Sequence, residues 1–247
     1  MQHITRRTVR IVRQTISQLP QFYVSLVRAS STSTSTSNST TPSPTFIESD
    51  ENYVQQVLLY GDSRLREVCP LVYEKARDRK DASVEQNVIA KQLCATAASY
   101  NSFGLAAPQI GKMRRMFAVT KDWRSTKATE LTTADDYAIY VDPIIVKLCQ
   151  SCTIQEDIES CLSIPGHRGP VSRFSSLYMS YIDGSSSRAK QKGEGGSNKK
   201  QRNNKRVTKK FVGFHARIIQ HEMDHLNGVL YIDHVDPDDI VKDGPLA

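Results

Sequence analysis

The chain has 247 residues, of which 38% are hydrophobic and 24% charged, a composition typical of globular proteins and not of disordered or fibrous ones. No apolar run approaches the roughly 20 residues that cross a bilayer, so we expect no membrane span. The net charge of +7 arises in two segments, because residues 1–47 carry five arginines and no acidic residue, and residues 184–206 carry eight basic residues and one acidic residue. The remainder of the chain is therefore acidic.

Residues 1–47 differ in composition from the rest of the chain. Arg6, Arg10 and Arg13 are placed at helical spacing among apolar residues, and a Ser/Thr/Asn tract fills residues 30–44. A segment rich in arginine and serine and poor in acidic residues is typical of an organelle transit peptide. We therefore interpret residues 1–47 as a disordered transit peptide and linker. The early arginines favour a mitochondrion over the alternative, a plastid. A disordered tail without a targeting role is the competing interpretation.

Residues 48–247 are expected to form one domain of the α+β class, with antiparallel sheets packed around a central helix. A helix is predicted over 84–100. Strands are predicted near 114–120, 138–148, 173–182 and 207–213. No parallel alternation of strands and helices is evident.

The basic segment 184–206 interrupts a predicted hairpin and is interpreted as a disordered insertion. Its charge suits neutralisation of RNA phosphates, as in a contact with ribosomal RNA. It contains no aromatic residue for base stacking, so a solvated loop expansion is the favoured alternative.

The most informative motif is H-E-x-x-H at residues 221–225, within a predicted helix over 214–227. Positions i and i+4 share one helix face, so His221 and His225 can bind one metal ion. Glu222 stands beside the first ligand, where a carboxylate can exchange protons with a metal-bound water. The helix is expected to end at Asn227-Gly228. Residues 229–232 are then expected to form a short strand.

A hydrolytic metal site of this kind needs a third protein ligand. Tyr231 stands where one family of such enzymes has a third histidine, and no glutamate follows Glu222. The remaining ligand should therefore come from an upstream segment.

Three segments stand in order along the chain: 104–111 (GLAAPQIG), 159–166 (ESCLSIPG) and 220–225 (QHEMDH). They resemble the motifs of the peptide deformylase family, whose patterns are G-x-G-L-A-A-x-Q, E-G-C-L-S and Q-H-E-x-D-H. Segments 60–66 (YGDSRLR) and 141–143 (VDP) extend the resemblance. It covers roughly residues 53–235 apart from the insertion.

The resemblance implies a metal-dependent hydrolase that removes the formyl group from the N-terminal formyl-methionine of new polypeptides and releases formate. It implies that Cys161 is the third ligand, beside His221 and His225, for one divalent ion. Fe(II) is expected, with Zn, Ni or Co as substitutes. Organelle translation starts with formyl-methionine, which suits either organelle as the location.

The remaining roles are also implied by the resemblance. Glu222 is implied as general base and then general acid, and the Gln109 side chain and Leu162 N–H as donors to the developing oxyanion. Gly104 is expected to let an extended substrate approach closely. The substrate pocket is further assigned to Phe103, Leu105 and Ile218. Glu159 is a candidate hydrogen-bond partner of a ligand histidine, held by Arg173.

The chain departs from the family pattern at two glycine positions, which are Ser102 and Ser160 here. Glycine often permits a positive φ or a close approach of two backbones, so we expect these serines to affect the reaction rate and the fit of the substrate. Two other functions stay open. One is a metallopeptidase that uses the same helix, and the other is a non-catalytic relative that binds RNA or the ribosome through its insertion.

Overall fold

The computed structural model describes residues 53–73, 79–121, 133–148, 153–184 and 206–242, with only the backbone for 79–82. All of them belong to one compact unit, residues 50–247. The interpretations of residues 1–47 as a transit peptide and linker, and of most of 184–206 as a disordered insertion, fall outside the described residues. None of the described helices is both long enough and apolar enough to cross a membrane.

The larger sheet has five antiparallel strands in the order β1-β2-β3-β6-β7. These are β1 (Gly104–Ala106), β2 (Met116–Thr120), β3 (Tyr137–Leu148), β6 (Ser176–Asp183) and β7 (Arg206–Val212). Every residue of β2 is buried, because helices cover both faces of the sheet at this strand. A continuous apolar run such as Met-Phe-Ala-Val is what such a strand requires.

Two helices pack on opposite faces of this sheet. Helix α2 (Arg79–Ser99) packs Ile89 and Leu93 against Leu105, Met116 and Ile139 on one face. Helix α3 (Gly213–Leu226) packs its apolar side against Ala106, Phe117 and Met179 on the other face. Ten of the fourteen residues of α3 are buried, so this helix lies inside the domain.

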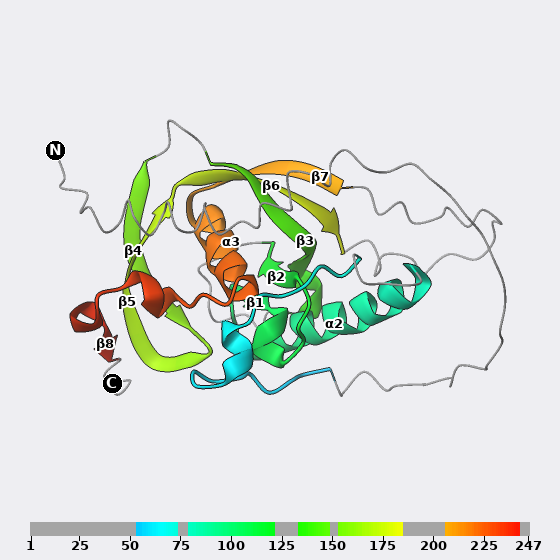
Figure 1. Ribbon diagram of the computed structural model, residues 1–247, viewed down its shortest axis with the longest axis horizontal. Coiled ribbons are helices and arrows are strands. Elements are labelled where there is room, and N and C mark those ends of the chain that lie inside the picture. Colours follow the sequence, from blue (N-terminus) through cyan, green and yellow to red (C-terminus); the bar gives the residue numbers. More distant parts are fainter. Residues whose placement is uncertain (1–52, 74–78, 122–132, 149–152, 185–205, 243–247) are drawn as a thin grey trace. The chain divides into compact units, whose positions relative to one another are not determined.

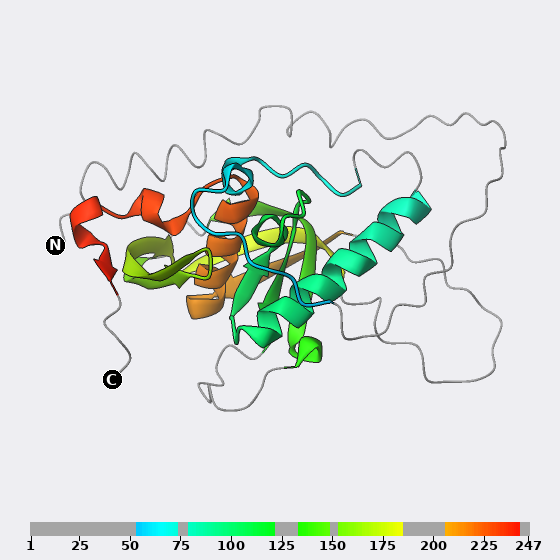
Figure 2. The same ribbon diagram turned by 90° about the horizontal axis from the view of Figure 1, so that it is seen from below.

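A second sheet covers the remaining side of α3. Its antiparallel strands are β4 (Ile154–Cys161), β5 (Ile164–Phe174) and β8 (Val241–Lys242), in the order β4-β5-β8. Figure 1 shows α3 (orange) between the β4–β5 hairpin and strands β1 to β3, and Figure 2 shows the same arrangement from below. Short 3-10 helices complete the described chain: η4 (Ser63–Arg66), η5 (Ala107–Ile110), η6 (Ala134–Asp136), η8 (Tyr231–His234) and η9 (Pro237–Asp239).

The predicted class, α+β with antiparallel sheets around a central helix, is confirmed. The predicted helix over 84–100 begins five residues earlier, at Arg79, and the second helix and the strands near β2, β3 and β7 lie within two residues of their expected ends. Gly228 ends α3 as expected, at φ +71, and a Cβ there would lie 2.4 Å from the Arg66 carbonyl oxygen.

Two expectations were wrong. Residues 229–232 form no strand, because the chain enters η8 at Tyr231 and both Leu230 and Tyr231 are buried against the second sheet. The strand predicted over 173–182 is two strands, since β5 ends at Phe174 and β6 begins at Ser176. The strand β4 was not predicted, because six of its eight residues are exposed and lack an apolar alternation.

Candidate active site

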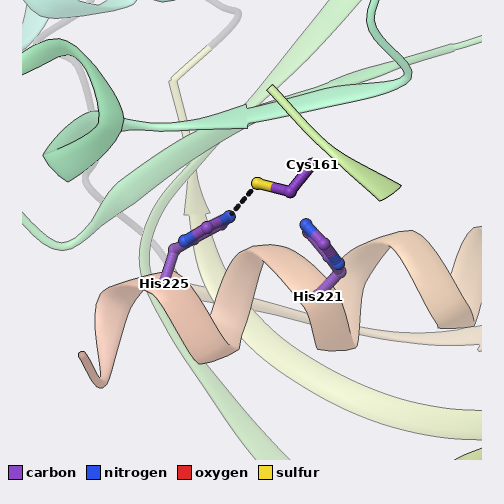
Figure 3. Close-up of side chains that lie close together, drawn as sticks. All are labelled: Cys161, His221 and His225. Carbon is purple, nitrogen blue, oxygen red and sulfur yellow. Dashed lines mark hydrogen bonds between the residues drawn. The ribbon is translucent and has the colours of Figure 1, made fainter. Parts of the chain in front are cut away.

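Three side chains from distant parts of the chain converge beside α3. Cys161 ends β4, and His221 and His225 lie one turn apart on α3. Their donor atoms all lie within 4.8 Å of one another. The Cys161 sulfur is 3.3 Å from Nε2 of His225, and both imidazoles point toward it in Figure 3. The residues that the resemblance names as metal ligands are therefore brought together.

The electrostatics of this cluster favour a thiolate. Burial opposes ionisation of the Cys161 thiol, but His225 and His221 outweigh it and hold the pKa of Cys161 well below its usual value. Burial likewise opposes a charge on His221, but its contacts with Cys161 and Glu159 raise the pKa of His221 well above the usual value. A thiolate is the form of cysteine that binds a metal ion, so this environment suits Cys161 as a ligand.

Glu159 orients the first histidine. Its Oε2 lies 3.0 Å from Nδ1 of His221, so the other ring nitrogen is left for the cluster. Arg173 donates two hydrogen bonds to this carboxylate, at 3.0 and 2.9 Å, and Arg217 donates another at 2.7 Å. Burial disfavours the charge on Glu159, but Arg173 and His221 more than offset it and keep the pKa of Glu159 well below the usual range.

The same arginine reaches a second carboxylate on α3. Arg173 donates to Asp224, which also lies 2.8 Å from Nε2 of His234 in η8. Burial disfavours ionisation of Asp224, but Arg173 and His234 outweigh it and lower its pKa to about 2. Arg217, Asp224 and His234 were missed by the sequence reasoning. Arg217 lies four residues before His221, and helical spacing alone could have indicated it.

Glu222 is buried beside β1, with 3% of its surface exposed. Its Oε2 has no hydrogen-bond partner among the described residues. Burial raises the pKa of Glu222 to about 7. A carboxyl group with this pKa can both accept and donate a proton near neutral pH.

Gln109 places its amide at the cluster. Its Nε2 lies 3.4 Å from the Cys161 sulfur and donates to Ser163 Oγ at 3.2 Å, while its Oε1 accepts the Ala106 N–H at 2.8 Å. The bond to Ala106 determines which end of the amide faces Cys161, because only the oxygen can accept an N–H. Leu162 follows Cys161 directly and packs against the α2 side of the core. Ser163 was not anticipated from the sequence.

The residues assigned to the substrate pocket divide into two groups. A Cβ on Gly104 would lie 2.5 Å from Glu222 Oε1 and 3.0 Å from Ile218 Cγ2, so Gly104 and Ile218 flank Glu222. Phe103 is 46% exposed, and its ring meets that of Phe214 edge to face, with 5.1 Å between the ring centroids. Leu105 does not join them, because its side chain lies fully buried in the core on the α2 side of β1. Its assignment to the pocket is therefore corrected, since neighbouring side chains of a strand point to opposite faces.

Two imidazoles and one thiolate form a donor set that suits a divalent transition metal and leaves a coordination position open. A buried carboxyl group with a pKa near neutrality stands next to the first ligand. The fold and this site define a metal-dependent hydrolase.

Comparisons with known proteins agree. The family model for polypeptide deformylase matches residues 54–240. The chain is 32% identical over 182 residues to peptide deformylase 1 of Nitrosomonas europaea, covering 72% of this chain and 85% of that protein. A class I type b peptide deformylase from Acinetobacter baumannii superimposes with a TM-score of 0.54 at 27% identity, covering 74% of this chain and 99% of the other. A peptide deformylase from Synechococcus elongatus in complex with actinonin superimposes with a TM-score of 0.55 at 25% identity, covering 81% of this chain and 88% of the other.

The chain belongs to the polypeptide deformylase family. It is accordingly an enzyme, a hydrolase that removes an N-formyl group.

Proposed function

We propose that this chain removes the formyl group from the N-terminal formyl-methionine of newly made polypeptides and releases formate. The observation that carries the proposal is the convergence of Cys161, His221 and His225 beside the buried carboxyl group of Glu222. Family membership supports the same reaction.

Cys161, His221 and His225 would hold one divalent ion. When bound, the ion supplies a water molecule acidic enough to act as a nucleophile near neutral pH. We assign Fe(II) as that ion, with Zn, Ni or Co as substitutes, because an anionic sulfur ligand beside two imidazoles suits these metals. Glu159 supports the site by keeping the His221 ring in one orientation.

Glu222 acts as the proton carrier of the reaction. It accepts a proton from the attacking water and delivers it to the leaving amine, and its raised pKa suits both steps. The amide of Gln109 and the backbone N–H of Leu162 stabilise the negative charge that develops on the formyl oxygen. The bond to Ala106 holds the Gln109 amide ready for this role. Losing one such donor typically costs about 100- to 1,000-fold in rate.

The substrate is proposed to bind along β1. This strand ends the larger sheet, so one of its edges has no neighbouring strand among the residues that the structure describes. An extended peptide can add to such an edge through main-chain hydrogen bonds. The absence of a side chain at Gly104 leaves room beside Glu222, and Ile218 flanks the same place. Phe103, which precedes β1, contacts Phe214 of α3.

Replacement of the proton carrier tests the reaction. We expect Glu222→Ala to retain its metal and to lose formate release by about 100- to 10,000-fold. The assay is anaerobic, with metal content measured beside formate released from a formyl-Met peptide, and Glu222→Gln serves as the isosteric control. Retention of activity in both variants would refute the assignment.

The two other functions predict different results in that assay. A metallopeptidase would cut internal bonds of an unformylated peptide and would show no preference for a formylated end. A non-catalytic RNA-binding relative would release no formate with any of the four metals. Family membership argues against a metallopeptidase, and the three retained ligands together with Glu222 argue against a non-catalytic relative.

We also propose an organellar ribosome or its RNA as a partner of the basic insertion. Lys147, Tyr178 and Lys210 lie side by side in register across β3, β6 and β7, and the insertion joins β6 to β7. Both lysines are exposed. Binding to RNA should weaken steeply with salt, by about 0.7 in log K per log salt for each phosphate contact. Equal binding after deletion of 185–205 would contradict the proposal.

Residues 1–47 are proposed to direct the protein to a mitochondrion, with a plastid as the alternative. The supporting observation is their arginine-rich, acid-free sequence. Fusing residues 1–47 to a fluorescent protein tests this, and the matched control replaces Arg6, Arg10 and Arg13 by Gln. Diffuse fluorescence of the unmodified fusion would contradict the proposal.

A further inference from the structure

Ser102, at a position where the family motif has glycine, makes a short hydrogen bond just before β1. Its Oγ donates to the Gly104 carbonyl oxygen at 2.6 Å. The backbone of Ser102 is itself held in place, because the buried Tyr137 hydroxyl donates to the Ser102 carbonyl at 2.6 Å. Ser102 does not have positive φ, so nothing in its backbone requires glycine. The hydroxyl is therefore the property that distinguishes this position.

The Gly104 carbonyl faces the free edge of β1. The Thr120 N–H donates to Phe103 O at 2.9 Å, and the register pairs Gly104 with Val119. In an antiparallel pair, hydrogen-bonded and non-hydrogen-bonded residues alternate. The main-chain carbonyl of Phe103 thus points toward β2, and the N–H and C=O of Gly104 point away from β2.

This free edge is also the edge that faces the cluster. Ala106 follows the same alternation as Gly104, and its N–H bonds to Gln109 Oε1 at 2.8 Å. The Nε2 of the same amide lies 3.4 Å from the Cys161 sulfur. An extended peptide that reaches the cluster along β1 therefore meets the Gly104 carbonyl as an acceptor for one of its own N–H groups.

We propose that Ser102 determines substrate affinity, because its hydroxyl occupies the Gly104 acceptor that an incoming peptide N–H would use. The inference rests on the proposed function. Ser102 is half-buried, so its displaced hydroxyl can turn to water, but the substrate must first break its hydrogen bond to Gly104 O. The bond from a main-chain N–H of the substrate to Gly104 O is not itself broken or formed in the reaction, so we expect it to be made equally before and during the reaction. Ser102 therefore acts on KM and leaves kcat unchanged.

The test compares full-length chains loaded with the same metal. Removal of the competing hydroxyl in Ser102→Ala should lower KM for a formyl-Met-Ala-Ser peptide by about 3- to 10-fold, the range expected for one neutral hydrogen bond, with kcat unchanged. Ser102→Thr retains the hydroxyl and should behave as the unmodified chain. Ser99→Ala is the matched control, because Ser99 Oγ bonds to the Thr96 carbonyl within α2 and not to β1.

A binding measurement separates this inference from the proposed reaction. The dissociation constant of the unformylated peptide Met-Ala-Ser should fall by the same factor in Ser102→Ala. The peptide has two peptide-bond N–H groups, and each can be replaced by an ester oxygen in a separate analogue. For one of these two esters, Ser102→Ala should no longer lower the dissociation constant. An unchanged or higher KM and dissociation constant in Ser102→Ala would overturn the inference. If Ser102→Ala binds the peptide more tightly but no variant releases formate, the inference about Ser102 is retained and the proposed reaction is refuted.

Discussion

The Glu159 carboxylate lies 3.0 Å from Nδ1 of His221, and the same carboxylate is bound by Arg173 and Arg217. The orientation of one cluster imidazole thus depends on a buried network that extends through Arg173 to Asp224. The contacts run from β4 through β5 to α3, which joins the second sheet to the helix that carries both histidines.

Neutralising Glu159 should weaken both the site and the fold. Glu159→Gln leaves Arg217 without its buried carboxylate partner, and leaves Arg173 with Asp224 as its remaining carboxylate. Breaking a buried ion pair in this way lowers the free energy of unfolding by on the order of 3–5 kcal/mol. Metal affinity should fall by about 10- to 100-fold, the usual effect of losing the partner of a metal-bound histidine. Competition with a chelator and thermal unfolding measure the two effects.

Asp157→Asn is the control for Glu159→Gln. Asp157 lies on the same strand, its side chain is 63% exposed, and its carboxylate is 4.0 Å from the Arg217 guanidinium. An exposed pair of this kind contributes at most about 1 kcal/mol. Equal losses in the two variants would show that burial of Glu159 has no special role.

Removal of the thiolate should affect metal binding before anything else. Cys161→Ser replaces a sulfur whose pKa is strongly lowered with a hydroxyl that stays protonated, so the cluster loses its anionic donor. We expect substoichiometric metal after dialysis, and loss of the thiolate charge-transfer absorption of the Co(II)-loaded protein. Cys69→Ser is the control, because burial raises the pKa of Cys69 to about 12 and this cysteine is no part of the cluster. Full metal content with an unchanged spectrum would rule out Cys161 as a ligand.

The stability of the metal-free protein should depend on pH through Glu222. Burial raises the pKa of Glu222 from 4.5 to about 7, so folding favours the protonated form. The resulting contribution to the free energy of unfolding is complete below pH 4.5. It is lost as the pH rises through 7, at up to about 1.4 kcal/mol per pH unit. Glu222→Gln cannot titrate at this position, so its stability relative to the unmodified chain should increase between pH 5 and 8. Urea unfolding at each pH measures the difference, and parallel curves would contradict the assignment.

A methyl group at Gly104 should displace the proton carrier. The Cβ of Gly104→Ala would lie 2.5 Å from Glu222 Oε1, and the end of that side chain can move while the fold persists. A displacement of about 1 Å at a reacting group can cost about 100-fold in rate, so kcat should fall by that order with metal content retained. Gly169→Ala is the control, since its Cβ would press on Val235 and not on Glu222. A kcat reduced equally in both variants would point to a general loss of structure.

Local signals were readable from the sequence because they operate over a few residues. The four-residue spacing of His221 and His225 placed them on one helix face, and Gly228 marked the end of that helix. The ordered motifs that resemble the family brought Cys161 into the site, although 64 residues separate it from His225. The candidate ligand set therefore needed no coordinates.

Contacts across the fold were decided by tertiary packing. Leu105 faces α2 and not the site, because the sheet presents its two faces to different helices. Residues 229–232 form no strand, and η8 begins at Tyr231, because Leu230 and Tyr231 are buried against β4 and β5, which a strand period cannot reveal. Asp224 and His234 meet because the chain folds back after α3. Periodicity is a property of neighbouring residues, whereas which faces meet depends on how whole elements bury their apolar surface.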